Sequence, residues 1–264
     1  MKFDPILIVS GEPNSIFSEI FFKSFKKIKI KRPIIIISSF NLLKQQMKKI
    51  NYGKKIKILE YDKIKKYKLD NNSINLINIE YRSKKIFDKI SKKSKKFINE
   101  SFNLAFKLIK KEKIKRLING PISKKNFLDN KFLGITEYIS TYFAKKNTCM
   151  LIFNKKLSVC PVTTHLPLKL VSKKINKKNI SEKVFLINDF YKKKFGFKPK
   201  IGILGLNPHC ESIDKFNEDE KIISSAIKSL NNQNINIKGP FPADTIFLKD
   251  NRKKFDVILG MYHD

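Results

Sequence analysis

The chain has 264 residues, of which 41% are hydrophobic, enough to bury the core of one large domain or two modest ones. No apolar run approaches the roughly 20 residues that a membrane-spanning helix needs, and no signal peptide opens the sequence, so we expect no membrane partner. The cysteines Cys149, Cys160 and Cys210 lack metal-ligand spacing. They are typical of free thiols in a reducing cytoplasm, where we expect the protein to reside.

The net charge of +34 raises nucleic acid as a partner. Arginine is the side chain that makes bidentate hydrogen bonds to phosphate and guanine. Most of the 57 basic residues are instead lysines, which are spread along the chain. The arginines are Arg32, Arg82, Arg116 and Arg252. Excess lysine together with isoleucine and asparagine is what an AT-rich genome imposes on any protein. We therefore expect no nucleic-acid partner.

Apolar, β-branched runs alternate with longer lysine-rich amphipathic stretches, which is the βαβ pattern of a mainly parallel sheet. Strands are predicted at 6–9, 33–38, 57–60, 74–79, 116–119, 150–153, 157–162, 201–206 and 257–259. Helices are predicted at 16–27, 42–50, 95–111, 181–195 and 218–230. The polar segment 61–72 is expected to be a surface excursion. The fold class is therefore α/β.

Two predicted strands end in glycine-containing turns. Gly11-Glu12-Pro13-Asn14-Ser15 connects the first strand to a helix whose amino end favours anions. Asn119-Gly120-Pro121-Ile122-Ser123-Lys124 follows a later strand, and its lysine would stand near the carboxyl edge of the sheet. Lys124 is there a candidate to contact a phosphate or carboxylate, although a simple solvated lysine fits equally well.

The three histidines of the chain each follow an apolar, strand-like run. They stand in Thr163-Thr164-His165-Leu166-Pro167, Asn207-Pro208-His209 and Met261-Tyr262-His263-Asp264. Ligands gather at the carboxyl ends of strands in open α/β sheets, and three imidazoles with an open fourth position are typical of a catalytic metal site. Chance scatter over surface and core is the competing interpretation, because no short ligand motif links the three.

Further motifs lie between and around these residues. They are Gly134-Ile135-Thr136-Glu137-Tyr138, Gly205-Leu206-Asn207-Pro208-His209 and Gly239-Pro240-Phe241-Pro242-Ala243-Asp244-Thr245. Taken in order with the turns and histidine motifs above, they resemble the 4-hydroxythreonine-4-phosphate dehydrogenase family of the vitamin B6 pathway. The resemblance runs from the Gly-Glu-Pro turn to the last residue.

The resemblance implies a two-subdomain α/β/α architecture like that of isocitrate and isopropylmalate dehydrogenases, mostly parallel, with helices on both faces of the sheets. Residues 1–130 would form the first subdomain and 131–264 the second. It implies a homodimer with the active site in a cleft, and a divalent metal (Zn, Mg or Co) held by His165, His209 and His263. With NAD or NADP, the family oxidises 4-phosphohydroxy-L-threonine, and the product decarboxylates to 3-amino-2-oxopropyl phosphate.

Other roles are inferred less directly. Asp244 and Asp264 are candidates to orient a metal ligand or to transfer a proton, although both could simply cap turns. Asn207 is a candidate cofactor contact. Lys124 is a candidate either for a catalytic role or for supporting the residues that have one. The GxGxxG dinucleotide motif is absent, and the family binds NAD without it.

Two departures from the family stand out. A histidine usually occupies the position of Ile135, paired with the threonine that matches Thr136, and both contact substrate. The family also continues past the position of Asp264 with residues that bind substrate and complete the first subdomain. We therefore expect the 264-residue chain alone to bind metal weakly and to be nearly inactive.

These departures keep two alternatives open. The first is a sister dehydrogenase for another phosphorylated hydroxy acid, of the erythronate or threonate type. The second is a truncated, non-catalytic remnant.

Overall fold

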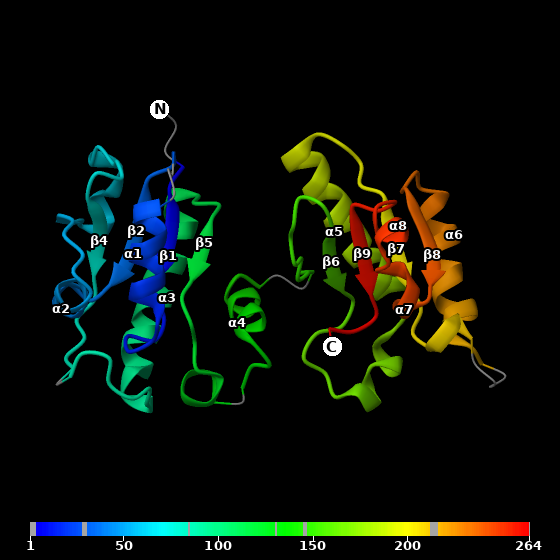
Figure 1. Cartoon of the computed structure of the whole chain (residues 1–264), viewed down its shortest axis with the longest axis horizontal. Coiled ribbons are helices and arrows are strands. Elements are labelled where there is room, and N and C mark those ends of the chain that lie inside the picture. Colours follow the sequence, from blue (N-terminus) through cyan, green and yellow to red (C-terminus); the bar gives the residue numbers. More distant parts are fainter. Residues whose placement is uncertain are drawn as a thin grey trace. The chain divides into compact units, whose positions relative to one another are not determined.

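The computed structural model describes residues 4–27, 31–83, 85–129, 131–144, 147–211 and 216–263. The chain divides into two compact units, Met1–Tyr138 and Ile139–Asp264. Each unit contains its own sheet and its own helices (Figure 1). The division falls inside the short helix α4 (Ile135–Tyr142), a few residues after the predicted boundary at residue 130.

The first unit contains a five-stranded parallel sheet in the order β3-β4-β2-β1-β5. Its strands are β1 (Ile6–Val9), β2 (Ile34–Ser38), β3 (Ile56–Ile58), β4 (Ile74–Asn78) and β5 (Leu117–Asn119). Every residue of β2 is buried, as expected for a central strand that is covered on both faces.

Helices cover the two faces of this sheet. Ile8, Ile34 and Ile36 alternate with residues of the opposite face, and they pack with α1 (Phe17–Lys27) and α2 (Phe40–Lys49). The longer helix α3 (Lys95–Glu112) contacts β1 and β2 with its own buried stripe. Short helical turns complete the unit: η1 (Tyr61–Lys66), η2 (Lys92–Ser94) and the π-helical η3 (Lys124–Leu128).

The second unit contains a four-stranded parallel sheet in the order β6-β9-β7-β8. Its strands are β6 (Ser158–Pro161), β7 (Ile201–Leu204), β8 (Ile237–Phe241) and β9 (Val257–Gly260). The helical elements are η4 (Leu168–Leu170), η5 (Ser172–Lys174), α5 (Lys177–Phe195), η6 (Pro208–Cys210), η7 (Asp219–Ser224), α6 (Ser225–Asn231), α7 (Ala243–Ile246) and α8 (Lys249–Arg252).

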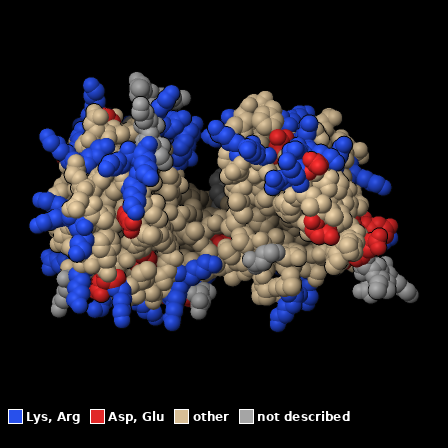
Figure 2. Space-filling model, viewed as in Figure 1, with Lys and Arg blue, Asp and Glu red and all other residues tan. Residues whose placement is uncertain are grey.

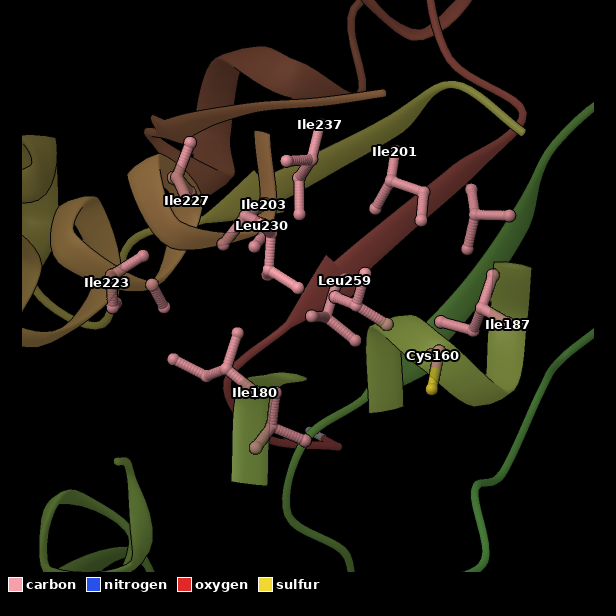
Figure 3. Packing of buried hydrophobic residues seen from close by; sticks show 14 of the residues in the cluster. Cys160, Ile180, Ile187, Ile201, Ile203, Ile223, Ile227, Leu230, Ile237 and Leu259 are labelled. Carbon is pink, nitrogen blue, oxygen red and sulfur yellow. The ribbon is translucent and has the colours of Figure 1, made fainter. Parts of the chain in front are cut away.

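The main core of the second unit lies between its sheet and the helices α5 and α6. Figure 3 shows Ile180 and Ile187 of α5 beside Cys160 and Leu259 of the strands, and Leu230 of α6 beside Ile203. Ile246 of α7 packs with residues of the other face of the sheet in a smaller cluster. Parallel sheets with helices on both faces confirm the predicted fold class.

Two strand predictions need correction. Residues 150–153 do not form a strand of the sheet, and Ile152 makes only an isolated antiparallel bridge to Val159. Conversely, β8 was not predicted, because Gly239 and Pro240 interrupt its pattern and both are normally depleted in strand interiors. An edge position tolerates the proline, since one side of the strand needs no donors.

One helix prediction also needs revision. The predicted helix over 218–230 is divided, because η7 is π-helical and only the later part is the α-helix α6. The short helices α4, α7 and α8 were not predicted.

Basic side chains are distributed over the surface of both units on the face shown in Figure 2, without gathering into one patch. This distribution is typical of a compositional lysine excess. Among the residues that the structure describes, no helix has the length and apolar character needed to cross a membrane.

Candidate functional site

The motif residues of the second unit follow its strands at one edge of the sheet. Because all four strands are parallel, the turns after β6, β7, β8 and β9 meet at the carboxyl edge. The turns after β6 and β9 are tied together, since the Thr163 hydroxyl donates to the Met261 carbonyl at 2.8 Å. This bond fixes the approach to His165 relative to the approach to His263.

A cavity of about 480 Å³ opens at this edge. Its lining includes the ionisable side chains of His209, His263, Asp244 and Tyr262 and the apolar side chains of Phe247 and Met261. Three turns that are far apart in sequence therefore converge on one pocket. Its volume is within the usual range for a small-molecule site.

The histidines have unusual backbone conformations. His165 and His209 both adopt the left-handed region, with φ of 54° and 57°. A non-glycine residue there costs about 1–3 kcal/mol, and such strain is concentrated at functional sites. The rings of His165 and His263 lie side by side, with centroids 5.7 Å apart, and His209 shares the cavity with His263.

These residues suit a divalent metal by their chemistry, since neutral imidazole is the commonest protein ligand of such ions. In the part of the chain that the structure describes, however, no three His, Cys, Asp or Glu side chains are gathered closely enough to hold a metal. His209 and His263 are both exposed at this edge. The three histidines are thus of the residue type that suits the implied metal and follow strands of one sheet, but they are not gathered into a closed ligand set.

The turn that carries Asn207 is held by a residue that the sequence analysis did not single out. Asp219, in η7, is 1% exposed. It accepts hydrogen bonds from the Leu206 and Asn207 backbone N–H groups and from the Asn207 side chain. The segment Glu218-Asp219-Glu220 is typical of an exposed helix start, so nothing in its pattern pointed to burial. The Asn207 side chain, the predicted cofactor contact, also donates to Glu218 at 3.3 Å.

The other predicted site residues belong to the first unit or lie outside the residues that the structure describes. Ile135 and Thr136 open helix α4, and both are half-buried. Lys124 begins η3 and is exposed. Asp264 lies outside the described residues.

The Gly-Glu-Pro turn of the first unit is closed. The Glu12 N–H donates to the Pro121 carbonyl at 2.9 Å, and Gly120 N–H donates to Val9 at 2.8 Å. A methyl group on Gly120 would lie 2.1 Å from the Ser10 carbonyl oxygen, so the two turns approach too closely for any side chain. The turns that follow β1 and β5 are therefore in direct backbone contact.

The carboxylate of Glu12 is sealed beneath this contact, with 2% of the residue exposed. Burial raises the pKa of Glu12, while hydrogen bonds from the Ser94 hydroxyl (2.7 Å) and the Ser123 backbone oppose the rise. Glu12 therefore joins three segments of the first unit: the turn after β1, the start of α3 and the turn after β5.

Comparison with known proteins identifies the relatives of this chain. The family model of the pyridoxal phosphate biosynthetic protein PdxA matches residues 29–264. A protein of Sulfurihydrogenibium sp. named 4-hydroxythreonine-4-phosphate dehydrogenase is 36% identical over 263 residues, covering 98% of this chain and 80% of that relative. A protein of the same name from Pseudoalteromonas translucida is 28% identical over 264 residues, covering 98% and 79%.

Solved structures agree in fold. A 4-hydroxythreonine-4-phosphate dehydrogenase from Klebsiella pneumoniae superposes with a TM-score of 0.81 at 20% identity, over 99% of this chain and 82% of that one. A dehydrogenase of the same name from Burkholderia phymatum gives 0.80 at 23% identity, over 100% and 82%. The predicted resemblance is thereby confirmed: the chain belongs to the PdxA family of pyridoxal phosphate biosynthetic proteins and is an oxidoreductase of that family.

Proposed function

We propose that this chain catalyses the NAD- or NADP-dependent, metal-dependent oxidation of 4-phosphohydroxy-L-threonine. The product, 2-amino-3-oxo-4-phosphooxybutanoate, would then lose its carboxyl group to give 3-amino-2-oxopropyl phosphate. The observation that supports this most strongly is family membership, with a 36% identical relative that bears the name of this activity. The pocket at the carboxyl edge of the second sheet supplies a candidate site.

In this proposal His165, His209 and His263 hold the divalent metal, which is Zn, Mg or Co. When bound, such an ion supplies Lewis acidity that lowers the pKa of a hydroxyl and polarises a ketone. Asp244 lines the same cavity as His209 and His263 and is exposed to it, so its carboxylate can receive the proton that the substrate hydroxyl releases. The apolar side chains of Phe247 and Met261 limit the water around that proton transfer.

Thr136, Lys124 and Asn207 are proposed contacts to substrate or cofactor. Thr136 offers a hydroxyl and Lys124 an exposed ammonium that suits a phosphate or carboxylate. We further propose that the enzyme acts as a homodimer in the cytoplasm. Its free cysteines, Cys149, Cys160 and Cys210, are consistent with a reducing compartment.

One specific residue favours a second candidate function. Isoleucine at position 135 can neither donate nor accept a side-chain hydrogen bond, where the family resemblance implies a histidine that contacts substrate. A sister enzyme acting on a 4-phosphorylated erythronate or threonate would need a different contact at this point. Ile135 therefore keeps this sister activity as the alternative.

The test is a substrate panel with defined metal content. The purified chain is stripped with a chelator, reloaded with Zn²⁺, Mg²⁺ or Co²⁺, and assayed for reduction of NAD and NADP with each phosphorylated hydroxy acid. The turnover expected of the 264-residue chain is low, and we expect whatever turnover of 4-phosphohydroxy-L-threonine it has to be lost on chelation and restored by metal. Full activity after exhaustive chelation would overturn the metal dependence, and turnover of the erythronate or threonate compound alone would establish the alternative.

A further inference from the structure

A buried carboxylate lies directly behind the turn that presents His209. Asp219 belongs to η7, at the start of the helical segment that continues into α6. Its own backbone is anchored there, because its carbonyl accepts from the Ser224 hydroxyl at 2.8 Å and its N–H donates to the Asn217 side chain at 2.9 Å. These two hydrogen bonds hold the backbone from which the Asp219 side chain extends.

The carboxylate oxygens are satisfied by the turn after β7. One oxygen accepts from the Leu206 N–H at 2.6 Å, and the other accepts from the Asn207 N–H at 3.1 Å and the Asn207 side chain at 3.0 Å. Hydrogen bonds to an ionised acceptor are about twice as strong as neutral ones. Removing such a buried partner leaves several donors unsatisfied, which destabilises the turn.

The turn is built to admit this carboxylate. A methyl group on Gly205 would lie 2.8 Å from the nearer Asp219 oxygen and 2.7 Å from the Cys210 sulfur, so only glycine leaves the space. Asn207 then opens the short turn η6, and the Cys210 N–H donates back to its carbonyl at 3.1 Å. His209 lies inside this turn with its left-handed backbone.

The strained conformation of His209 needs external support. Left-handed backbone is unfavourable for a histidine, so an unsupported turn would relax and carry the imidazole away from the cavity. The contacts of Asp219 fix the two residues that lead into this turn. Asp219 thus contacts one of the two segments that carry a histidine of the cavity lining.

We propose that Asp219 is a positioning residue, which holds the Leu206–Asn207 backbone so that His209 presents its imidazole to the cavity. This inference rests on the proposed function, in which His209 is a metal ligand. The role is indirect, since Asp219 itself is buried and its contacts are to the turn rather than to the cavity. It extends the site beyond the residues that line it.

The experiment compares Asp219→Asn with Glu220→Gln, the same chemical change at the adjacent, exposed position. The asparagine variant keeps the shape but turns one acceptor oxygen into a donor that faces N–H groups. The first measurement is Co²⁺ and Zn²⁺ binding by calorimetry, together with the visible absorption spectrum of bound Co²⁺. The second is the NMR signal of the imidazole Cε1–H groups in metal-free protein, which the presence of only three histidines makes simple to assign.

For Asp219→Asn we expect metal affinity to fall about tenfold or more, as for other residues that support metal ligands. The His209 Cε1–H signal should move toward its unfolded position, while those of His165 and His263 stay in place. Glu220→Gln should match the wild type in both measurements. Hydrogen exchange over β7 and β9 shows whether the Asp219 variant remains folded.

The outcomes separate the two proposals. An Asp219→Asn protein with wild-type metal affinity and an unmoved His209 signal would overturn the inference. Equal movement of all three histidine signals would also overturn it, because that would report general unfolding. If wild-type protein binds neither metal, the metal proposal fails, and the His209 signal alone then decides whether Asp219 holds the turn.

Discussion

The two units of this protein use the same device, a glycine turn at the end of a parallel strand, with opposite results. In the first unit, the turns at Gly11 and Gly120 are in backbone contact and seal Glu12 beneath them. In the second unit, the turn at Gly205 leaves room for the Asp219 side chain, and His209 beyond it stays exposed. A glycine after a strand therefore indicates that another segment approaches closely. At Gly120 that segment is the backbone of a second turn, and the two turns are closed against each other. At Gly205 it is the Asp219 side chain, and the turn leads to an exposed histidine.

The largest expected effect is in the cavity that the Gly205 turn and Asp244 both line. Replacing Asp244 by Asn should lower kcat by about a hundredfold or more, the usual contribution of a positioned proton acceptor, while metal binding persists. Steady-state kinetics measure this, with calorimetry for the metal. Asp250→Asn on α8, exposed and outside the cavity lining, is the matched control. Loss of less than about threefold would remove Asp244 from proton transfer.

A substitution in the closed turn at Gly120 should lower the free energy of unfolding rather than the catalytic rate. Gly120→Ala places a methyl group 2.1 Å from a backbone oxygen that cannot easily move. We expect unfolding free energy to drop by about 3 kcal/mol or more, as for severe overpacking. Gly53→Ala, with nothing within 4 Å, is the control and should be nearly neutral.

Urea denaturation and hydrogen exchange locate the effect of the Gly120 substitution. The loss should be confined to peptides of the first unit. If Gly120→Ala and Gly53→Ala had the same urea denaturation midpoint, the close contact at Gly120 would not contribute to stability.

A smaller effect is expected at the start of α4. Ile135→His restores the hydrogen-bonding side chain that the family resemblance implies, so turnover of 4-phosphohydroxy-L-threonine should rise about ten- to a hundredfold. Ile139→His, one helical turn later and also half-buried, serves as the control. Equal kcat/KM for both variants and wild type would show that position 135 does not contact this substrate.

The smallest expected effect is a pH dependence from Glu12. Its pKa is raised in the folded state, so the folded protein keeps the proton at pH values where the unfolded chain, near the ordinary value of 4.5, has lost it. Stability should therefore fall as pH rises from 4.5 through the folded pKa. Glu12→Gln removes this contribution and should flatten the profile of unfolding free energy between acidic and neutral pH.

Glu220→Gln, at an exposed carboxylate, should leave the pH profile unchanged. Denaturant midpoints at several pH values provide the measurement. A slope in Glu12→Gln equal to that of wild type would assign the pH dependence to other groups.

Much of the fold followed from the pattern of apolar residues. The runs at β1, β2 and β4 were predicted almost to the residue, because continuous β-branched sequence is typical of strands buried on both faces. Prediction failed where local pattern and tertiary position disagree. Residues 150–153 have strand-like composition but only one bridge partner, and β8 has a glycine and a proline but a strand to pair with.

For the candidate site, the sequence by itself determined the family, the parallel α/β class and the turns that hold His165, His209 and His263, since these depend on residue type and order. Only the tertiary structure decided which turns share a cavity, that the Gly11 and Gly120 turns are closed against each other, and that Asp219 lies buried behind Asn207. The physical reason is that burial and hydrogen-bond partners are set by elements distant in sequence. An acidic residue in a polar segment has the same neighbours in sequence whether it is exposed to water or buried against a turn of the site.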